Sequence, residues 1–190
     1  SRDYVFDGKG SRPYREDDAT APLGVYGASK RAGELAILAA GGAPLILRTS
    51  WVYGAHGHNF LRTMLRLAAE RDELRVVADQ LGTPTAACLV ADTTARLLAL
   101  GGQAQGVLHL TAAGGTSWHG FAEAIVAGAT ARGLLARAPR VVPVTTAGFP
   151  TRAARPAYSR LSVAKLESLL GPMPAWEQGV DRVLDRMISG

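Results

Sequence analysis

The chain has 190 residues, of which 47% are hydrophobic and 19% charged, a composition typical of a globular protein with one core of ordinary size. No apolar run is long enough to cross a bilayer and no secretory leader is visible, so we expect no membrane partner and a cytoplasmic protein. The arginines behind the net charge of +5 are scattered and Cys88 is the only cysteine, which argues against a nucleic-acid binder, a disulfide framework and a cysteine-based zinc site.

Helix and strand patterns alternate along the chain. A strand end, "SRDYVFDG", opens it, and a long helix follows Pro22 and ends at Gly41 and Gly42. Further apolar runs, typical of buried strands, cover 45–54, 74–78, 106–112 and 140–144. Periodic segments typical of helices cover 59–73, 88–102, 117–133, 162–170 and 175–188. This alternation predicts βαβ units and an α/β fold with a mostly parallel sheet.

The segment 139–160 interrupts the alternation. It is rich in proline, arginine and threonine and has no clear hydrophobic period. Long irregular segments in compact domains are often functional, so this one is a candidate functional segment.

The predicted first helix carries Tyr26 and Lys30, four residues apart. This spacing puts both side chains on one helix face, so a phenol and an ammonium can share a pocket. A nearby ammonium lowers the pKa of a tyrosine from its ordinary value of about 10, which suits a general acid that protonates a carbonyl oxygen. The alternative is an exposed tyrosine stacked on a lysine stem, and the pair alone does not separate the two.

Longer motifs surround this pair: "DYVFDGKGSRPYREDDATAPLGVYGASKRAGE", "LRTSWVYG", "NFLRTML", "VVADQLGTPT", "GVLHLTAAGGTSWHGFA" and "RPAYSRLS". Together they closely resemble the dTDP-4-dehydrorhamnose reductase family of extended short-chain dehydrogenases/reductases, over essentially the whole chain. The resemblance implies a Rossmann-like, doubly wound parallel sheet with a small C-terminal α/β lobe that binds substrate. It implies reduction of the 4-keto group of dTDP-4-dehydro-6-deoxy-L-mannose to dTDP-L-rhamnose, with NADPH or NADH as hydride donor.

The resemblance also assigns roles to single residues. Tyr26 matches the catalytic tyrosine that protonates the C4 oxygen, and Lys30 matches the lysine that lowers its pKa and binds the nicotinamide ribose. Both are therefore predicted as catalytic and cofactor-binding. Matches on the substrate side are Arg2, Asp3, Tyr4, Trp51, Asn59 and Arg155. The alternatives are a core aromatic for Trp51, a plain helix cap for Asn59 and a surface charge for Arg155.

Two features depart from the family pattern. No glycine fingerprint for dinucleotide binding occurs, and in the family it would precede Ser1 by about a hundred residues, the size of several βαβ units. We therefore expect a partial sheet whose N-terminal strands are missing, and a chain that is inactive by itself. Arg2 stands where the family has a threonine whose hydroxyl hydrogen-bonds the substrate carbonyl, which indicates either an impaired activity or an altered chain end.

Within one truncated reductase domain, residues 1–54 and 74–112 are predicted to form the Rossmann part. Residues 55–73 and 113–190 are predicted to form mainly the substrate-binding part. The acidic run 15–19 is predicted as a solvated loop before a helix, where negative charge suits the helix N-terminus.

No metal site is predicted. His56 and His58 have a spacing that suits metal ligation, but no carboxylate or cysteine set accompanies them. Some family members bind magnesium through glutamates at a dimer interface, and we match no such glutamates in this chain.

Three functions remain open at this point. The first is the reductase, with a nucleotide-sugar substrate, no nucleic-acid partner and a homodimer as the assembly to test. The second is a non-catalytic regulatory subunit of the methionine adenosyltransferase type, favoured by Arg2 and by the absent glycine fingerprint. A composition rich in alanine and arginine, typical of bacteria with GC-rich genomes, counts against it. The third is a related nucleotide-sugar epimerase.

Overall fold

The computed structural model describes residues 1–148 and 155–189 of the chain. The helices are α1 (Val25–Ala39), α2 (Phe60–Glu70), α3 (Ala87–Ala99), α4 (Trp118–Ala131), α5 (Ala164–Leu170) and α6 (Trp176–Ser189). The strands are β1 (Leu45–Arg48), β2 (Val52–Tyr53), β3 (Glu73–Val77), β4 (Leu81–Gly82), β5 (Thr85–Ala86), β6 (Gly106–His109), β7 (Thr116–Ser117) and β8 (Arg140–Val144). The helices predicted from sequence are all present, within a few residues of their expected ends. None of the helices in the described residues is both long and apolar enough to cross a membrane.

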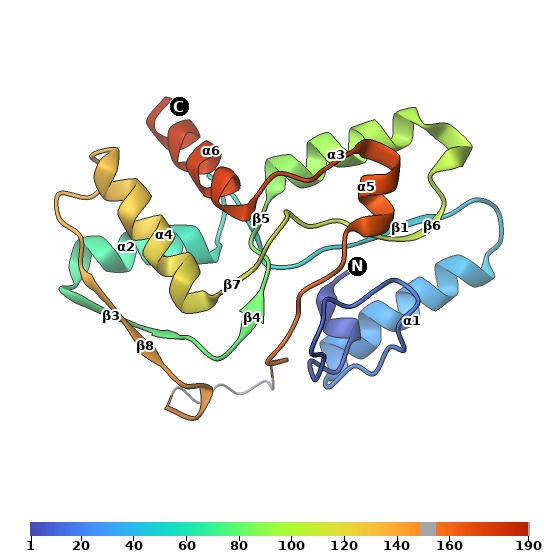
Figure 1. Cartoon of the computed structure of the whole chain (residues 1–190), viewed down its shortest axis with the longest axis horizontal. Coiled ribbons are helices and arrows are strands. Elements are labelled where there is room, and N and C mark those ends of the chain that lie inside the picture. Colours follow the sequence, from blue (N-terminus) through green and yellow to red (C-terminus); the bar gives the residue numbers. More distant parts are fainter. Residues whose placement is uncertain (149–154, 190) are drawn as a thin grey trace.

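The elements form two lobes, which lie on opposite sides in Figure 1. The first lobe contains the parallel pair β1 and β6, and the chain start runs beside β1. There Arg2 forms a parallel bridge with Thr49, and the backbone N of Asp3 donates to the carbonyl of Thr49 at 3.1 Å. The predicted parallel α/β arrangement is thus confirmed. Helices α3 and α5 cover this sheet through a core of Leu97, Ala104, Leu108, Leu110, Leu166 and Met173.

The second lobe contains the parallel pair β3 and β8, covered by α2 and α4. Phe121 lies at its centre with an exposed fraction of 0%, and its ring contacts those of Tyr53, Phe60 and Trp176. Strand β3 belongs here because it pairs with β8 and buries Leu74 in this core. Residues 74–77, which the prediction counts with the Rossmann part, thus pair with β8 in the second lobe. The division into a Rossmann part and a substrate-binding part stays a prediction.

The apolar run 45–54, predicted as one strand followed by a loop, is two strands with a bend between them. Strand β1 ends at Arg48, and Trp51 has a φ of 43°, a left-handed conformation that is rare for a bulky residue. Beyond the bend, β2 leaves β6 and pairs in parallel with β5. The bend carries the chain from the first lobe to the second, and hydrophobicity alone does not reveal it.

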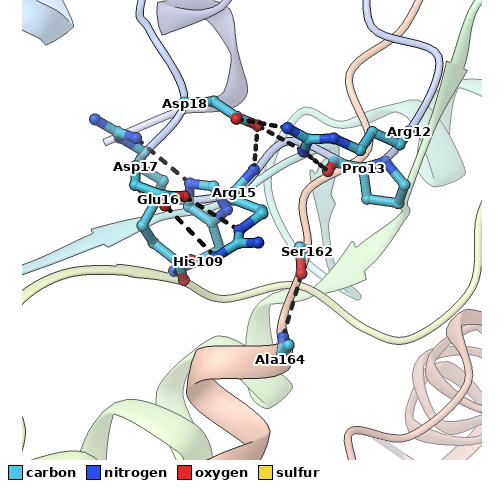
Figure 2. A network of polar contacts seen from close by, with 10 residues as sticks. Arg12, Pro13, Arg15, Glu16, Asp17, Asp18, His109, Ser162 and Ala164 are labelled. Atoms are coloured by element: carbon cyan, nitrogen blue, oxygen red, sulfur yellow. Dashed lines mark hydrogen bonds and ion pairs between the residues drawn. The ribbon is translucent and has the colours of Figure 1, made fainter.

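The acidic run 15–19 is a loop whose residues are exposed or half-exposed, as predicted, but it ends several residues before α1 and takes part in a hydrogen-bonded network (Figure 2). Asp18 pairs with the guanidinium of Arg12 at 2.8 Å and accepts from the backbone N of Arg15 at 2.7 Å. These hydrogen bonds lower the pKa of Asp18 to about 2. Glu16 accepts from the backbone N of His109, at the end of β6, at 2.9 Å. The loop is therefore fastened to the sheet.

The irregular segment 139–160 begins with β8 and is described as far as residue 148. Residues 149–154 lie outside the described part of the chain. From residue 155 onward the segment returns to the first lobe, where Leu161 forms a parallel bridge with Tyr14 and Tyr158 forms one with Leu81.

Candidate active site

A pocket of about 410 Å³ opens between the two lobes. Its walls are Arg2, Tyr4, Tyr26, Trp51, Val52, Phe60, Trp118 and Arg155. Five of these residues were predicted from the sequence, and they come from four separate stretches of the chain. Their convergence on one cavity makes this pocket the candidate active site.

Tyr26 and Lys30 meet at the edge of this pocket, near the start of α1. The Tyr26 side chain is half exposed and packs edge-on against the ring of Tyr4, with 5.8 Å between centroids. The Lys30 Nζ lies 5.3 Å from the centroid of the Tyr26 ring, so the ammonium faces the phenol as the spacing predicts. This contact alone also fits the stacked-lysine alternative, but a merely exposed tyrosine would not lie on the wall of a pocket.

Two stacked indoles form the floor of the pocket. The rings of Trp51 and Trp118 lie 3.5 Å apart between centroids and 6° from parallel. Behind Trp51 lies Gly82, where any side chain would collide with the indole. The sequence left open whether Trp51 is a core aromatic or a residue on the substrate side. In the structure its side chain is buried and also lines the pocket.

Sequence reasoning missed Trp118 and Phe60 as pocket residues. Trp118 is the first residue of α4, directly after the Ser117 cap, and Phe60 is the first residue of α2, directly after the Asn59 cap. The ring of Phe60 lies 4.7 Å from that of Trp118. The available signal was an aromatic residue at the start of each helix, where a side chain can point past the helix end toward a cleft.

Asp3 lies under the pocket and is not among the residues that line it, and its predicted place beside the sugar stays a prediction. Its side chain is 1% exposed, and Ser50 Oγ donates to its Oδ2 at 3.4 Å. Burial raises the pKa of Asp3 to about 6, although Ser159 and the charge of Arg2 oppose the shift. The residue points inward because residues 3–5 form a 3-10 turn directly after the strand end.

The side chain of Asn59 makes its hydrogen bonds inside its own loop, and its predicted contact with the substrate stays a prediction. Its Oδ1 accepts from the backbone N of Arg62, and its Nδ2 donates to the carbonyl of Gly54 at 2.9 Å and to that of His56 at 3.1 Å. The cap alternative therefore describes Asn59, and the amide is not part of the pocket lining.

Arg155 and Arg2 bring two guanidinium groups to the pocket. Planar guanidinium forks suit phosphate and carboxylate oxygens, so the pocket favours an anionic ligand. Burial also raises the pKa of Tyr4, so this phenol stays protonated and can act as a hydrogen-bond donor.

A second cavity of about 500 Å³ adjoins the first and shares Phe60, Trp118 and Arg155 with it. The remaining walls come from α2, β3 and the residues just after each of them, and are Thr63, Met64, Leu67, Arg71, Glu73, Leu74, Arg75, Val76, Val77 and Gln80. Most of this surface is apolar, with arginines at its edge. The two cavities together suit a long ligand with a flat apolar end and charge in the middle.

Clusters of three or more histidine, cysteine, aspartate or glutamate side chains with metal-binding geometry are absent from residues 1–148 and 155–189. His56 and His58 are exposed in the loop before α2.

The parallel α/β arrangement and the tyrosine–lysine pair beside a cleft are typical of Rossmann-like dinucleotide-dependent reductases. A family model described as the RmlD substrate binding domain matches residues 1–189, and the chain belongs to this family. A dTDP-4-dehydrorhamnose reductase of Burkholderia thailandensis is 49% identical to the chain, covering 100% of it and 67% of the relative. The reductase of Escherichia coli K12 is 43% identical, covering 100% of the chain and 64% of the relative.

Solved structures agree with this assignment. A dTDP-4-dehydrorhamnose reductase from Bacillus anthracis, solved in complex with NADP, has a TM-score of 0.89 and 38% identity over 98% of the chain. A Clostridium acetobutylicum dTDP-4-dehydrorhamnose reductase has a TM-score of 0.91 and 35% identity over 99% of the chain. The chain covers 64% of each of these structures, so it spans about two thirds of the length of its relatives. These relatives support the reductase prediction and give no support to the regulatory-subunit alternative.

Proposed function

We propose that the full-length protein reduces the 4-keto group of dTDP-4-dehydro-6-deoxy-L-mannose to give dTDP-L-rhamnose. The observation that carries the proposal is the position of Tyr26 on the wall of a pocket that also contains Arg2, Tyr4, Trp51 and Arg155. The reductase names of relatives up to 49% identical support the same substrate.

In this reaction the Tyr26 hydroxyl donates its proton to the C4 oxygen as charge develops there. General acid catalysis of this kind contributes roughly 10²- to 10⁴-fold to a rate. Tyr4, edge-on to Tyr26, restricts how far the phenol can swing. Arg2 offers N–H donors on the same wall, in place of the hydroxyl that the family pattern predicts.

The proposed cofactor is NADPH, in keeping with the NADP bound to the Bacillus anthracis relative. A reduced nicotinamide supplies a hydride to C4 when bound. Lys30 fits the nicotinamide ribose of such a group, because it is exposed beside the phenol and its ammonium can donate to ribose hydroxyls.

The second cavity would take the nucleotide half of the substrate. Its apolar wall between α2 and β3 suits a flat thymine ring, and Arg155 lies on the wall that the two cavities share. A diphosphate between sugar and nucleoside would then pass Arg155, where a guanidinium can bind it.

The test follows reduced-cofactor absorbance when the full-length protein meets the keto sugar. The wild type should consume NADPH in step with dTDP-L-rhamnose formed, which separates a reductase from an epimerase because an epimerase consumes none. Tyr26→Phe should lower kcat by about 10²- to 10⁴-fold. Tyr158→Phe is the matched control, because Tyr158 lines neither cavity. Turnover that survives Tyr26→Phe unchanged would exclude the proposed role of the phenol.

A cytoplasmic location and a homodimer are also part of the proposal. NADPH and nucleotide sugars are cytoplasmic metabolites, and a single cysteine suits a reducing compartment. Several apolar side chains of α1 are exposed and would suit a partner subunit, among them Leu35 and Ile37. Sedimentation equilibrium at several concentrations tests the assembly, and a monomer throughout would contradict it.

A further inference from the structure

Helix α1 carries both predicted catalytic side chains, and two of its residues are buried against the rest of the described chain. Its buried residues are Gly27 and Glu34, seven positions apart and therefore on one face. Figure 1 shows α1 running along the outer side of its lobe. Within the described residues, the buried contacts of α1 are those at Gly27 and Glu34, and the ring of Tyr26 adds an edge-on contact with Tyr4.

Gly27 provides the first contact, directly after Tyr26 and three residues before Lys30. Its Cα faces the carbonyl of Tyr4 so closely that any side chain at this position would collide with that oxygen. This contact sets how near the helix lies to the pocket wall, but a carbonyl against a bare Cα does little to fix rotation.

Glu34 provides the second contact through a two-pronged ion pair with Arg48 at the end of β1. Arg48 Nε donates to Glu34 Oε1 and Nη2 donates to Oε2, both at 2.8 Å. The two side chains are 1% and 3% exposed. Burial by itself would raise the pKa of Glu34, but the hydrogen bonds from Arg48 and Ser1 and the charges of Arg48 and Arg31 together hold that pKa below its ordinary value. The pair is therefore charged, and its planar geometry tolerates little rotation of the helix.

Arg48 is itself held from three sides. It stands opposite His109 in the β1–β6 register, and its Nη1 lies 3.4 Å from His109 Nε2. Its guanidinium carbon lies 5.2 Å from the centroid of the Phe6 ring. The backbone N of His109 in turn donates to Glu16, as Figure 2 shows. These contacts hold the Arg48 guanidinium in one orientation, in which it binds both carboxylate oxygens of Glu34.

We propose that the Glu34–Arg48 pair positions the catalytic tyrosine: it fixes the rotation of α1 so that Tyr26 and Lys30 face the pocket. The inference rests on the proposed function. Tyr26 lies eight residues before Glu34, about 12 Å along the helix axis. A rotation of α1 therefore moves the phenol across the pocket mouth, and misplacement by about 1 Å costs a catalytic group roughly 100-fold in rate.

Activity of the full-length protein gives the first readout. Glu34→Gln and Arg48→Lys each remove the charged two-pronged geometry while keeping the side-chain size close. Both should lower kcat by about 30-fold or more and change the KM for the keto sugar by less than about 3-fold, because the sugar-facing residues stay in place. Glu70→Gln is the matched control, since it breaks an exposed pair with Arg66 on α2 and should leave kcat unchanged.

A double variant separates positioning from simple stabilisation. Glu34→Leu/Arg48→Met replaces the buried pair by apolar side chains, an exchange that is often neutral or stabilising. The unfolding midpoint should return to that of the wild type or rise above it. The kcat should stay low, because the two hydrogen bonds that fix the rotation of α1 are absent. Recovery of kcat together with the unfolding midpoint would overturn the proposal.

Hydrogen exchange gives a readout that does not depend on turnover. Amides of residues 25–39 should exchange at least about 10-fold faster in Glu34→Gln than in the wild type, with those of residues 60–70 unchanged. Faster exchange in α1 with an unchanged kcat would overturn the positioning role. If the wild type itself does not reduce the keto sugar, the proposed function fails first, and exchange still reports whether the pair fixes α1.

Discussion

Helices α2 and α1 both border the active-site pocket, yet different forces hold them. Helix α2 buries Leu61, Met64 and Ala68 against the core of the second lobe. Helix α1 buries a glycine and a carboxylate, and leaves several apolar side chains exposed. Hydrophobic packing is non-directional and scales with buried area, whereas an ion pair and a backbone contact depend on direction. We therefore expect stability to reside mainly in the second lobe and catalytic geometry in the attachment of α1.

The strongest test of this contrast is Phe121→Ala in the second lobe. Removing a fully buried ring that contacts three other aromatic rings should lower the free energy of unfolding by about 3–5 kcal/mol. Leu35→Ala on α1, where Leu35 is 51% exposed, should change it by less than about 0.5 kcal/mol. Urea unfolding of both variants measures the difference. Equal losses would mean that α1 is packed as firmly as the core.

A pH-dependent test concerns Asp3, under the pocket. Burial raises its pKa to about 6, so between pH 4 and 6 the folded state holds a proton that the unfolded state has lost, and stability falls as pH rises. Burial likewise lowers the pKa of His109 to about 4, which makes stability rise with pH up to about 6.5 and offsets the first effect.

Asp3→Asn removes only the first of these contributions. The stability of the variant relative to the wild type should increase by about 2–3 kcal/mol between pH 4 and pH 6.5. Urea unfolding across this range measures it. A difference that does not change with pH would mean that Asp3 titrates normally in the folded protein.

Two glycines of α1 differ in their surroundings, since Gly27 lies against the backbone of Tyr4 and Gly33 faces open space. Gly27→Ala should lower the free energy of unfolding by about 2 kcal/mol, because the methyl group meets the carbonyl of Tyr4 and the helix must move. Gly33→Ala has open space around it and should raise the free energy by about 0.5–1 kcal/mol through helix propensity. Circular dichroism during thermal unfolding compares them. The two variants should change the free energy of unfolding in opposite directions. A change in the same direction would mean that Gly27 does not determine the position of α1.

The smallest expected effect concerns the loop before α2. Asn59→Ala removes the helix cap and the amide bonds to the loop, and should lower stability by about 1 kcal/mol. Asn59→Asp keeps the capping oxygen but not the N–H donors, so it should recover part of the loss. If Asn59→Ala instead raised KM strongly with no loss of stability, the side chain would contact the ligand after all.

The sequence motifs pointed to residues that line one pocket, but they did not reveal the path of the backbone around it. Tyr26 and Lys30 were recognisable because helical spacing puts them on one face whatever surrounds the helix. Trp51, Tyr4 and Arg155 were predicted from motif resemblance, and the fold brings them together. The residue types of Asp3 and Asn59 did not reveal that neither side chain lines the pocket. Asp3 is turned inward by the 3-10 turn, and the amide of Asn59 is taken by carbonyls of its own loop.

Local order along the chain determined the fold class, the helices and the tyrosine–lysine pair, since periodicity, caps and turn residues act over a few positions. Only the tertiary structure decided how the lobes meet. It set the bend of the backbone at Trp51. It also brought together side chains of separate elements, as in the stacking of Trp51 on Trp118 and the ion pair between Glu34 and Arg48. Such contacts depend on shape and desolvation in the assembled molecule, and no short stretch of sequence contains that information.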